Sequence, residues 1–207
     1  MPIRGLGTVY AFDLGRLTGF CYGRPGEPPV SGSWTLYKPS EGIEQGFSNF
    51  IACLQDLFDA DRPSLVSWAQ PFSPQAMQAQ DTPISAAALR SQYGFRAILA
   101  GVARRYDSHI KEINEATVRK HFLGKGRASD GEDIKALVLA RCHLIQLFPR
   151  SVMDTDRADA CAIHDWACAQ YGLESTSLKT LHLFGERPTE GANKRGKRSG
   201  RQYRPLV

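Results

Sequence analysis

The sequence predicts an α/β fold built on a mixed five-stranded sheet flanked by helices. Three observations predict it. Three β-rich segments follow one another near the N-terminus, helical and β-rich segments then alternate, and the last two regular segments are helical. A run of strands joined by short turns indicates antiparallel pairing, whereas a strand that is reached through a helix favours parallel pairing.

The first two β-rich segments span residues 8–14 and 17–23 and are joined by a turn that contains Gly15. A third segment, residues 30–37, continues the pattern. Aromatic and β-branched residues fit a pleated, half-buried surface, so we expect three consecutive antiparallel strands.

An amphipathic helix is predicted next, with a start near Ser40 and Glu41. Its apolar residues recur at helical spacing: Ile43, Phe47, Phe50, Ile51, Leu54, Leu57 and Phe58. Residues 65–68 form a short apolar run between Pro63 and Pro71, which is typical of a buried strand. Helix and strand together predict a β-α-β crossover to a parallel strand.

The remaining segments complete the α/β order. Residues 71–83, rich in Pro, Gln and Ser, predict a loop. The pattern then predicts a long helix over 84–106, a strand over 109–113, a short helix over 116–123 that ends at Gly124, and helices over 132–148 and 156–171.

The chain has 207 residues and 42% hydrophobic content, which is enough for one well-buried domain, expected over residues 1–180. Residues 181–207 are expected to form a basic, flexible tail. From Glu186 to Val207 there are seven Lys and Arg residues against two Glu, so this stretch carries a net charge of +5, equal to that of the whole chain. Such a tail favours a polyanionic partner, and a solubilising role fits the composition equally well.

No segment has the roughly 20 apolar residues of a membrane helix, and residues 1–8 lack the apolar core of a signal peptide. We therefore expect a cytoplasmic or nucleoid-associated protein that is not secreted and has no membrane partner. The five cysteines are odd in number and scattered, which indicates reduced core thiols. Cys161, His164 and Cys168 share a helical face, but a soft-metal site there lacks a fourth ligand.

Asp13 is the first candidate site residue, because it ends the first predicted strand in the string AFDLGRLTGF. A carboxylate buried at a strand end requires a neutralising cation, and a divalent metal is the obvious candidate. Gly15 and Gly19 would keep the following turn tight and let a phosphate approach the backbone. Actin-like ATPases use a similar Asp-x-Gly turn, but they require a second domain and a further nucleotide loop.

Two further aspartates open the last predicted helix, in the string DTDRADACAI. Asp156 and Asp159 are three residues apart and so project from one helical face. Asp154 and Asp156 also have an ordinary explanation, because acidic residues cap helix N-termini. Asp159 precedes small and apolar residues, so its carboxylate is expected near the core side of the helix.

In order and spacing, four strings together resemble RuvC-type Holliday junction resolvases, which belong to the ribonuclease H-like nucleases. These strings are the Asp13 turn, VSWAQPF at 66–72, VRKHFLGKGRA at 118–128 and the DRADA helix start. The similarity spans residues 9–171 and leaves the tail unmatched. The family has Glu-Gln at the end of the fourth strand, followed two residues on by Phe. This chain has Ala69 at the glutamate position.

The resemblance implies a ribonuclease H-like fold and a crossover junction endodeoxyribonuclease active in DNA recombination and repair. It implies hydrolysis of phosphodiester bonds with two Mg²⁺ ions per active site, for which Mn²⁺ is an expected substitute. Asp13, Asp156 and Asp159 would bind the metal, and Ala69 occupies the position of the missing ligand. Carboxylate oxygen is the ligand that such hard ions prefer.

Loss of the glutamate predicts a chain that binds DNA but cuts it poorly, since each 1.4 kcal/mol of lost transition-state stabilisation slows a reaction about tenfold. We interpret the chain as an inactivated Glu-to-Ala variant, introduced or natural, and favour the first. Gln70 is not expected to compensate, because adjacent strand residues point to opposite faces and an amide is a weaker ligand.

The resemblance also implies DNA contacts. Phe72 matches an aromatic residue that inserts at the junction centre, although a core role for Phe72 is equally open. Arg119 matches a lysine near the scissile phosphate and is surrounded by further basic residues, Lys120, Lys125 and Arg127. A second expected basic position falls on Asp130, so Lys125, Arg127 or Lys135 would take that role. A merely solvated basic loop is the alternative.

Resolvases of this type cut two symmetric strands, which implies a homodimer bound to branched DNA. The predicted helix over 84–106 is a candidate interface through Leu89, Tyr93, Phe95 and Leu99, although a buried central helix has the same pattern. Two other functions remain open: a non-catalytic branched-DNA-binding protein, and a ribonuclease H-like nuclease that acts on flaps or RNA-DNA hybrids.

Overall fold

Five strands form one mixed sheet in the order β3-β2-β1-β4-β5 in the computed structural model, which describes residues 6–71, 85–126 and 131–172. The strands are β1 (Thr8–Asp13), β2 (Leu17–Gly23), β3 (Val30–Thr35), β4 (Pro63–Ala69) and β5 (His109–Ile113). The predicted mixed five-stranded sheet is confirmed.

The pairing directions are also those predicted. β1 pairs with β2, and β2 with β3, in antiparallel register, whereas β1 with β4 and β4 with β5 are parallel. The carboxyl ends of β1, β4 and β5 therefore meet at one edge of the sheet, which is where ligand-binding residues gather in α/β proteins.

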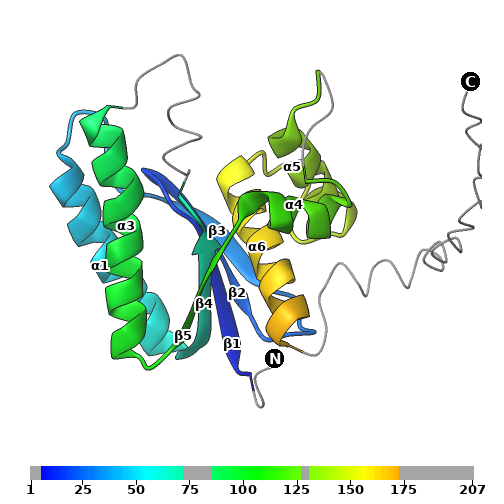
Figure 1. Cartoon of the computed structure of the whole chain (residues 1–207), viewed down its shortest axis with the longest axis horizontal. Coiled ribbons are helices and arrows are strands. Elements are labelled where there is room, and N and C mark those ends of the chain that lie inside the picture. The colour runs from blue at the N-terminus through cyan, green and yellow to red at the C-terminus, as the bar shows by residue number, and fades with distance from the viewer. Residues whose placement is uncertain (1–5, 72–84, 127–130, 173–207) are drawn as a thin grey trace, which may run out of the picture.

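Helices cover both faces of the sheet. In Figure 1, α1 (Ile43–Ala60) and α3 (Ala86–Arg105) lie on one side of it. The other side carries α4 (Glu115–Leu123), α5 (Ile134–Leu144) and α6 (Thr155–Tyr171). In the described part of the chain, no helix is both long and apolar enough to cross a membrane.

The alternation of side chains along β1 assigns each residue to a face. Tyr10 and Phe12 are fully buried in an aromatic cluster with Phe50, Phe58 and other residues of α1 and α3. Ala11 packs in the cluster of α4, α5 and α6 instead. Because alternate residues share a face, Asp13 follows Ala11 toward α6.

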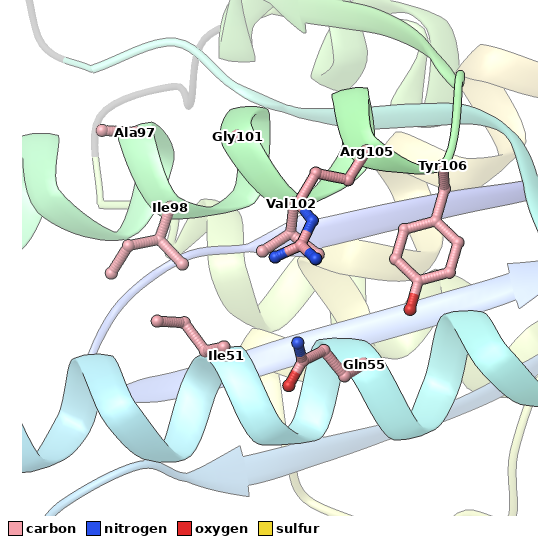
Figure 2. Close-up of a pocket in the computed structure, with 8 residues that line it drawn as sticks. All are labelled: Ile51, Gln55, Ala97, Ile98, Gly101, Val102, Arg105 and Tyr106. Atoms are coloured by element: carbon pink, nitrogen blue, oxygen red, sulfur yellow. The ribbon is translucent and has the colours of Figure 1, made fainter.

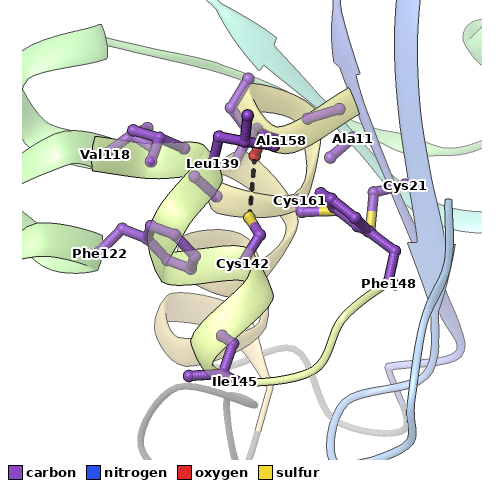
Figure 3. Packing of buried hydrophobic residues seen from close by; sticks show 14 of the residues in the cluster. Ala11, Cys21, Val118, Phe122, Leu139, Cys142, Ile145, Phe148, Ala158 and Cys161 are labelled. Atoms are coloured by element: carbon purple, nitrogen blue, oxygen red, sulfur yellow. Dashed lines mark hydrogen bonds between the residues drawn. The ribbon is translucent and has the colours of Figure 1, made fainter. Parts of the chain in front are cut away.

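The α6 side of the core contains most of the cysteines. Cys21, Cys142 and Cys161 are buried together, and the Cys142 thiol donates to the carbonyl of Ala158 at 3.7 Å (Figure 3). All five cysteines are free, and only Cys53 is not fully buried. The expected role as core thiols is confirmed.

Several helix ends differ from the prediction. α1 begins at Ile43 after Gly42, which offers no side-chain cap, and Glu41 instead accepts a hydrogen bond from the Lys38 amide at 2.6 Å. α5 is shorter than the predicted 132–148, because the chain leaves the helix at Ile145 and continues through Gln146 at a φ of 59°.

The short helix α4 begins one residue early, at Glu115, with Asn114 as its N-cap. It ends as predicted at Gly124, whose φ of 79° suits glycine. The predicted loop at 71–83 lies almost entirely outside the described residues.

Candidate functional site

Asp13 and Ala69 lie side by side at the ends of two parallel strands. The register pairs Phe12 with Trp68, so the next residues along β1 and β4 are Asp13 and Ala69. Ala69 packs against the same cluster as Ala11, and both Asp13 and Ala69 line the same cavity. Residue 69 therefore faces Asp13, as the resemblance implies.

Gly19 allows α6 to approach this strand end. It pairs with Asp13 across β1 and β2, and a Cβ atom at this position would lie 1.9 Å from the carbonyl oxygen of Asp156. Only glycine fits between the sheet and the first turn of α6. We had expected Gly19 to serve the turn and an approaching phosphate, but the described backbone uses it for helix packing.

The first turn of α6 brings the remaining aspartates to the site. Asp154 is the N-cap, and its Oδ1 accepts a hydrogen bond from the Arg157 amide at 2.9 Å, so its predicted capping role is confirmed. The ammonium of Lys135, on α5, lies 3.3 Å from Asp156 Oδ1 and 3.4 Å from Asp159 Oδ2. The Asp159 side chain is 12% exposed and that of Asp156 is 24% exposed, which agrees with the expected core-side position of Asp159.

The electrostatics of the site follow from the burial of like charges. Burial and the nearby Asp159 carboxylate raise the pKa of Asp13 to about 7, although the Lys135 ammonium opposes the shift. Burial likewise raises the pKa of Asp159. For Lys135, burial alone would lower the pKa, but the Asp159, Asp13 and Asp156 carboxylates together raise it. Lys135 therefore stays charged and partly neutralises the three aspartates.

Asp13 opens onto a cavity of about 580 Å³. Its walls include Asp13, Ala69, Arg96, Glu115 and Lys135. An adjoining inner pocket is lined by Asp13, Ala69, Glu115, Arg119 and Asp159. Gln70, which follows the last residue of β4, also lines the larger cavity.

Sequence reasoning missed Arg96 and Glu115. The Arg96 guanidinium donates two hydrogen bonds of 3.1 Å to the Ala69 carbonyl and a further bond to the Gln92 carbonyl. It thereby holds the end of β4 in place. Arg96 is one of four arginines in α3, so the sequence does not distinguish it from the others or specify its partner. Glu115 looks like an ordinary acidic residue in a first helical turn.

The expected DNA-binding residues are only partly brought together. Arg119 reaches the inner pocket and forms an ion pair with Glu115 on the same helix. Lys120 is exposed, whereas Lys125 is paired with Glu132 at 2.6 Å. Phe72 and Arg127 lie outside the described residues.

The donor set fits a hard divalent cation in its chemistry. Asp159 Oδ2 is a buried oxygen with no hydrogen bond among the described residues. The oxygens are not yet gathered around one point, because within residues 6–71, 85–126 and 131–172 no three His, Cys, Asp or Glu side chains stand in position to hold an ion. The Lys135 ammonium pairs with two of them, Asp156 and Asp159, and its side chain is 43% exposed.

The proposed interface on α3 needs correction. Phe95 and Leu99 are fully buried in the core of the monomer, so only Leu89 and Tyr93 of the four expected residues remain exposed. A second groove, of about 320 Å³, separates α1 from α3 (Figure 2). It is lined mainly by apolar residues together with Gln55 and Arg105 and contains no carboxylate, so it lacks the chemistry of the Asp13 site.

Comparison with known proteins supports this architecture. A solved structure of RuvC from Thermus thermophilus is similar with a TM-score of 0.57 and 15% identity, covering 79% of this chain and 95% of that chain. T. thermophilus RuvC in complex with Holliday junction substrate is similar with a TM-score of 0.58 and 15% identity, covering 76% and 90%. No family model matches the chain, and no curated protein matches it. The chain therefore has the fold of RuvC, a ribonuclease H-like mixed sheet flanked by helices.

Proposed function

We propose that this chain is a structure-specific DNA endonuclease of the RuvC type, which binds four-way junctions and cuts them slowly because Ala69 replaces a catalytic glutamate. One observation carries the proposal: Asp13 from β1 and Asp159 from α6, far apart in the sequence, line one pocket beside Ala69. The same fold occurs in a RuvC solved in complex with Holliday junction substrate.

The proposed cofactor is Mg²⁺, with Mn²⁺ as a substitute. Asp13, Asp156 and Asp159 would hold it, because carboxylate oxygens are its preferred ligands. Asp13 lines the larger cavity, Asp13 and Asp159 line the inner pocket, and Asp156 shares the Lys135 ammonium with Asp159. Bound divalent ions would supply an activated water and charge neutralisation for the departing oxygen. Lys135 would move from its position between Asp156 and Asp159 toward an incoming phosphate.

Positive side chains around the cavity support a DNA substrate. Lys120 is exposed and can reach a phosphate backbone, whereas Arg119, in the inner pocket, would have to leave its ion pair with Glu115 to do so. Lys125, Arg127 and the aromatic Phe72 are proposed as further DNA contacts, the last as a residue that stacks on bases at the junction centre. Arg96 holds the backbone of residue 69 and would act as a positioning residue.

Ala69 is the reason to expect slow cleavage. Its methyl group lies next to Asp13 but cannot bind a cation, so a ligand is missing on the β4 side of the site. DNA binding depends on other residues and should survive. A homodimer is proposed as well, because symmetric cleavage of a junction needs two sites, and the exposed Leu89 and Tyr93 of α3 are available to it.

A non-catalytic junction-binding protein is the second candidate. The observation that favours it is the pairing of the Lys135 ammonium with Asp156 and Asp159, which neutralises carboxylates without any metal. Cleavage of flaps or RNA-DNA hybrids is a further possibility for the same site, since a metal site does not set substrate geometry.

The test is to restore the glutamate. Ala69→Glu protein should cut four-way junctions with Mg²⁺ at least about tenfold faster than the unaltered chain, equivalent to roughly 1.4 kcal/mol of transition-state stabilisation. Ala69→Glu combined with Asp13→Asn is the matched inactive control. Flap, RNA-DNA hybrid and linear duplex substrates should be assayed in parallel.

The outcomes separate the candidates. Cleavage of linear duplex alone would refute the junction assignment. Tight junction binding by Ala69→Glu without any cleavage would favour the non-catalytic protein, and faster cleavage of flaps or hybrids than of junctions would redirect the substrate class.

A further inference from the structure

Glu115 reaches the site from the strand next to β4. Ala69 pairs with Ile113 in the parallel register of β4 and β5, and the Gln70 amide donates to the Ile113 carbonyl at 2.8 Å. The chain that leaves β5 therefore passes directly beside the end of β4. Two residues after Ile113, Glu115 begins α4 behind its N-cap, Asn114.

The Glu115 side chain faces the carboxylates. It lines the larger cavity with Asp13 and Lys135, and it lines the inner pocket with Asp13, Ala69 and Asp159. Its negative charge contributes to the raised pKa values of both Asp13 and Asp159. Glu115 forms an ion pair with Arg119 one turn later, which restricts its side chain to this side of α4.

The neighbouring carboxylates have few protein partners. Asp159 Oδ2 is buried without a hydrogen bond among the described residues, the Lys135 ammonium lies 3.4 Å from it, and Arg119 lines the same inner pocket. The Asp13 side chain is half-buried beside the cavity and has no hydrogen bond to another residue in the described ranges. One ammonium shared by three carboxylates only partly neutralises them, so a further cation would stabilise the group.

We infer that Glu115 replaces the carboxylate lost at position 69 and supplies the fourth acidic ligand for a divalent cation, together with Asp13, Asp156 and Asp159. This inference rests on the proposed function, because it concerns the same site. The site then holds four carboxylates, although one comes from the start of α4 and not from the end of β4.

If Glu115 is the fourth ligand, tight metal binding no longer implies fast cleavage. Glu115 comes from the start of α4, after β5, and is also ion-paired with Arg119. It would therefore bring the number of carboxylate ligands back to four, but it would not place a ligand at the end of β4. The unaltered chain should therefore bind the cation well and still cleave slowly. Ala69→Glu improves cleavage more than it improves cation binding.

The experiment measures binding of Mn²⁺ alone to the full-length, metal-free chain, by electron paramagnetic resonance of the free ion and by calorimetry. The variants are Glu115→Gln, Asp13→Asn and the double variant Ala69→Glu with Glu115→Gln. Glu44→Gln is the matched control, because Glu44 also lies in a first helical turn and pairs with an arginine, Arg90. Thermal unfolding without metal verifies that each variant is folded.

We expect Glu115→Gln to weaken Mn²⁺ binding at least about tenfold, Glu44→Gln to leave it within about twofold, and the double variant to recover it. If Glu115→Gln binds Mn²⁺ like the unaltered chain while Asp13→Asn is weakened, the inference is overturned and the proposed function stands. If the unaltered chain and Ala69→Glu both bind no Mn²⁺, the proposed function fails together with the inference.

Discussion

At the scale of single residues, Asp13 determines how the site responds to pH and to a divalent cation. Its carboxylate sits at the end of a buried strand, near Asp159 and Asp156, and Lys135 supplies only partial compensation. A pKa of about 7 means that the empty site takes up a proton near neutrality. A divalent cation would displace that proton, because metal ligands must be deprotonated.

The first prediction concerns the stability of the metal-free protein. An unfolded Asp has a pKa near 3.8, so between about pH 4 and pH 7 the folded state binds the extra proton. The free energy of unfolding due to Asp13 is then highest at low pH and falls by roughly 1.4 kcal/mol per pH unit as pH rises toward 7. Urea unfolding in chelator at several pH values measures this slope.

Asp13→Asn is the control, because an amide does not titrate. We expect its stability to be less dependent on pH over this interval and to exceed that of the unaltered chain at pH 8. Parallel pH profiles for the two proteins would contradict the description of Asp13 as a buried, uncompensated acid.

The sequence was informative about some site residues and silent about others. Asp13 and Asp159 were predicted because an acid at a strand end and an acid beside small core residues both lack a simpler explanation. Glu115 was missed, since an acid in a first helical turn is ordinary and only the register of β4 and β5 reveals its neighbour. Arg96 was missed because its partner, the Ala69 carbonyl, is a backbone group.

At the scale of elements, the contact between β2 and α6 builds the site. Gly19 leaves room for the backbone of Asp156, and this contact sets how close the first turn of α6 comes to Asp13.

The strands and most helices could be predicted from the sequence, because apolar residues recur every second residue along a half-buried strand and about every 3.6 residues along an amphipathic helix. Helix ends were less predictable: α5 ends early at a residue of positive φ, which apolar periodicity does not reveal.

The second prediction tests this contact. Gly19→Ala would place a methyl group 1.9 Å from the Asp156 carbonyl oxygen, so α6 must shift. We expect a loss of about 1–3 kcal/mol in the free energy of unfolding, as for other overpacked sites, together with weaker Mn²⁺ binding. Chemical denaturation and a Mn²⁺ titration measure the two effects.

Gly101→Ala is the matched substitution elsewhere in the chain. Gly101 lies inside α3, and a Cβ there meets nothing within 4 Å. Alanine should therefore stabilise the helix by about 0.5–1 kcal/mol without changing Mn²⁺ binding. Equal effects of the two substitutions would argue against a tight contact between Gly19 and α6.

At the scale of the whole molecule, the sheet separates two kinds of surface. The α1 and α3 face buries an aromatic core and carries a mainly apolar groove. The edge where β1, β4 and β5 end carries the cavity that is lined by Asp13, Glu115, Arg96 and Lys135. In the sequence, the stretch from Glu186 to Val207 carries a net charge of +5, equal to that of the whole chain. We propose that this tail adds to DNA affinity without contributing to cleavage.

The third prediction follows from counterion release. Deletion of residues 181–207 should lower affinity for a four-way junction and flatten its salt dependence by at least about 2 in the log-log slope, because each phosphate contact adds roughly 0.9. Fluorescence anisotropy at several salt concentrations measures both quantities. A neutral Gly/Ser tail of equal length is the control. If the neutral tail binds as tightly as the native one, the tail has no part in DNA binding.

The location of bound Mn²⁺ in the full-length chain is the most direct test of the proposed metal site. Mn²⁺ added to the isotopically labelled full-length chain should broaden the amide resonances of residues at the ends of β1 and β4 and at the starts of α4 and α6. Resonances around the groove between α1 and α3 should remain sharp. Broadening centred on other acidic residues, such as Asp59 and Asp107, or absence of broadening near Asp13 at saturating Mn²⁺, would contradict a metal-dependent site at this edge of the sheet.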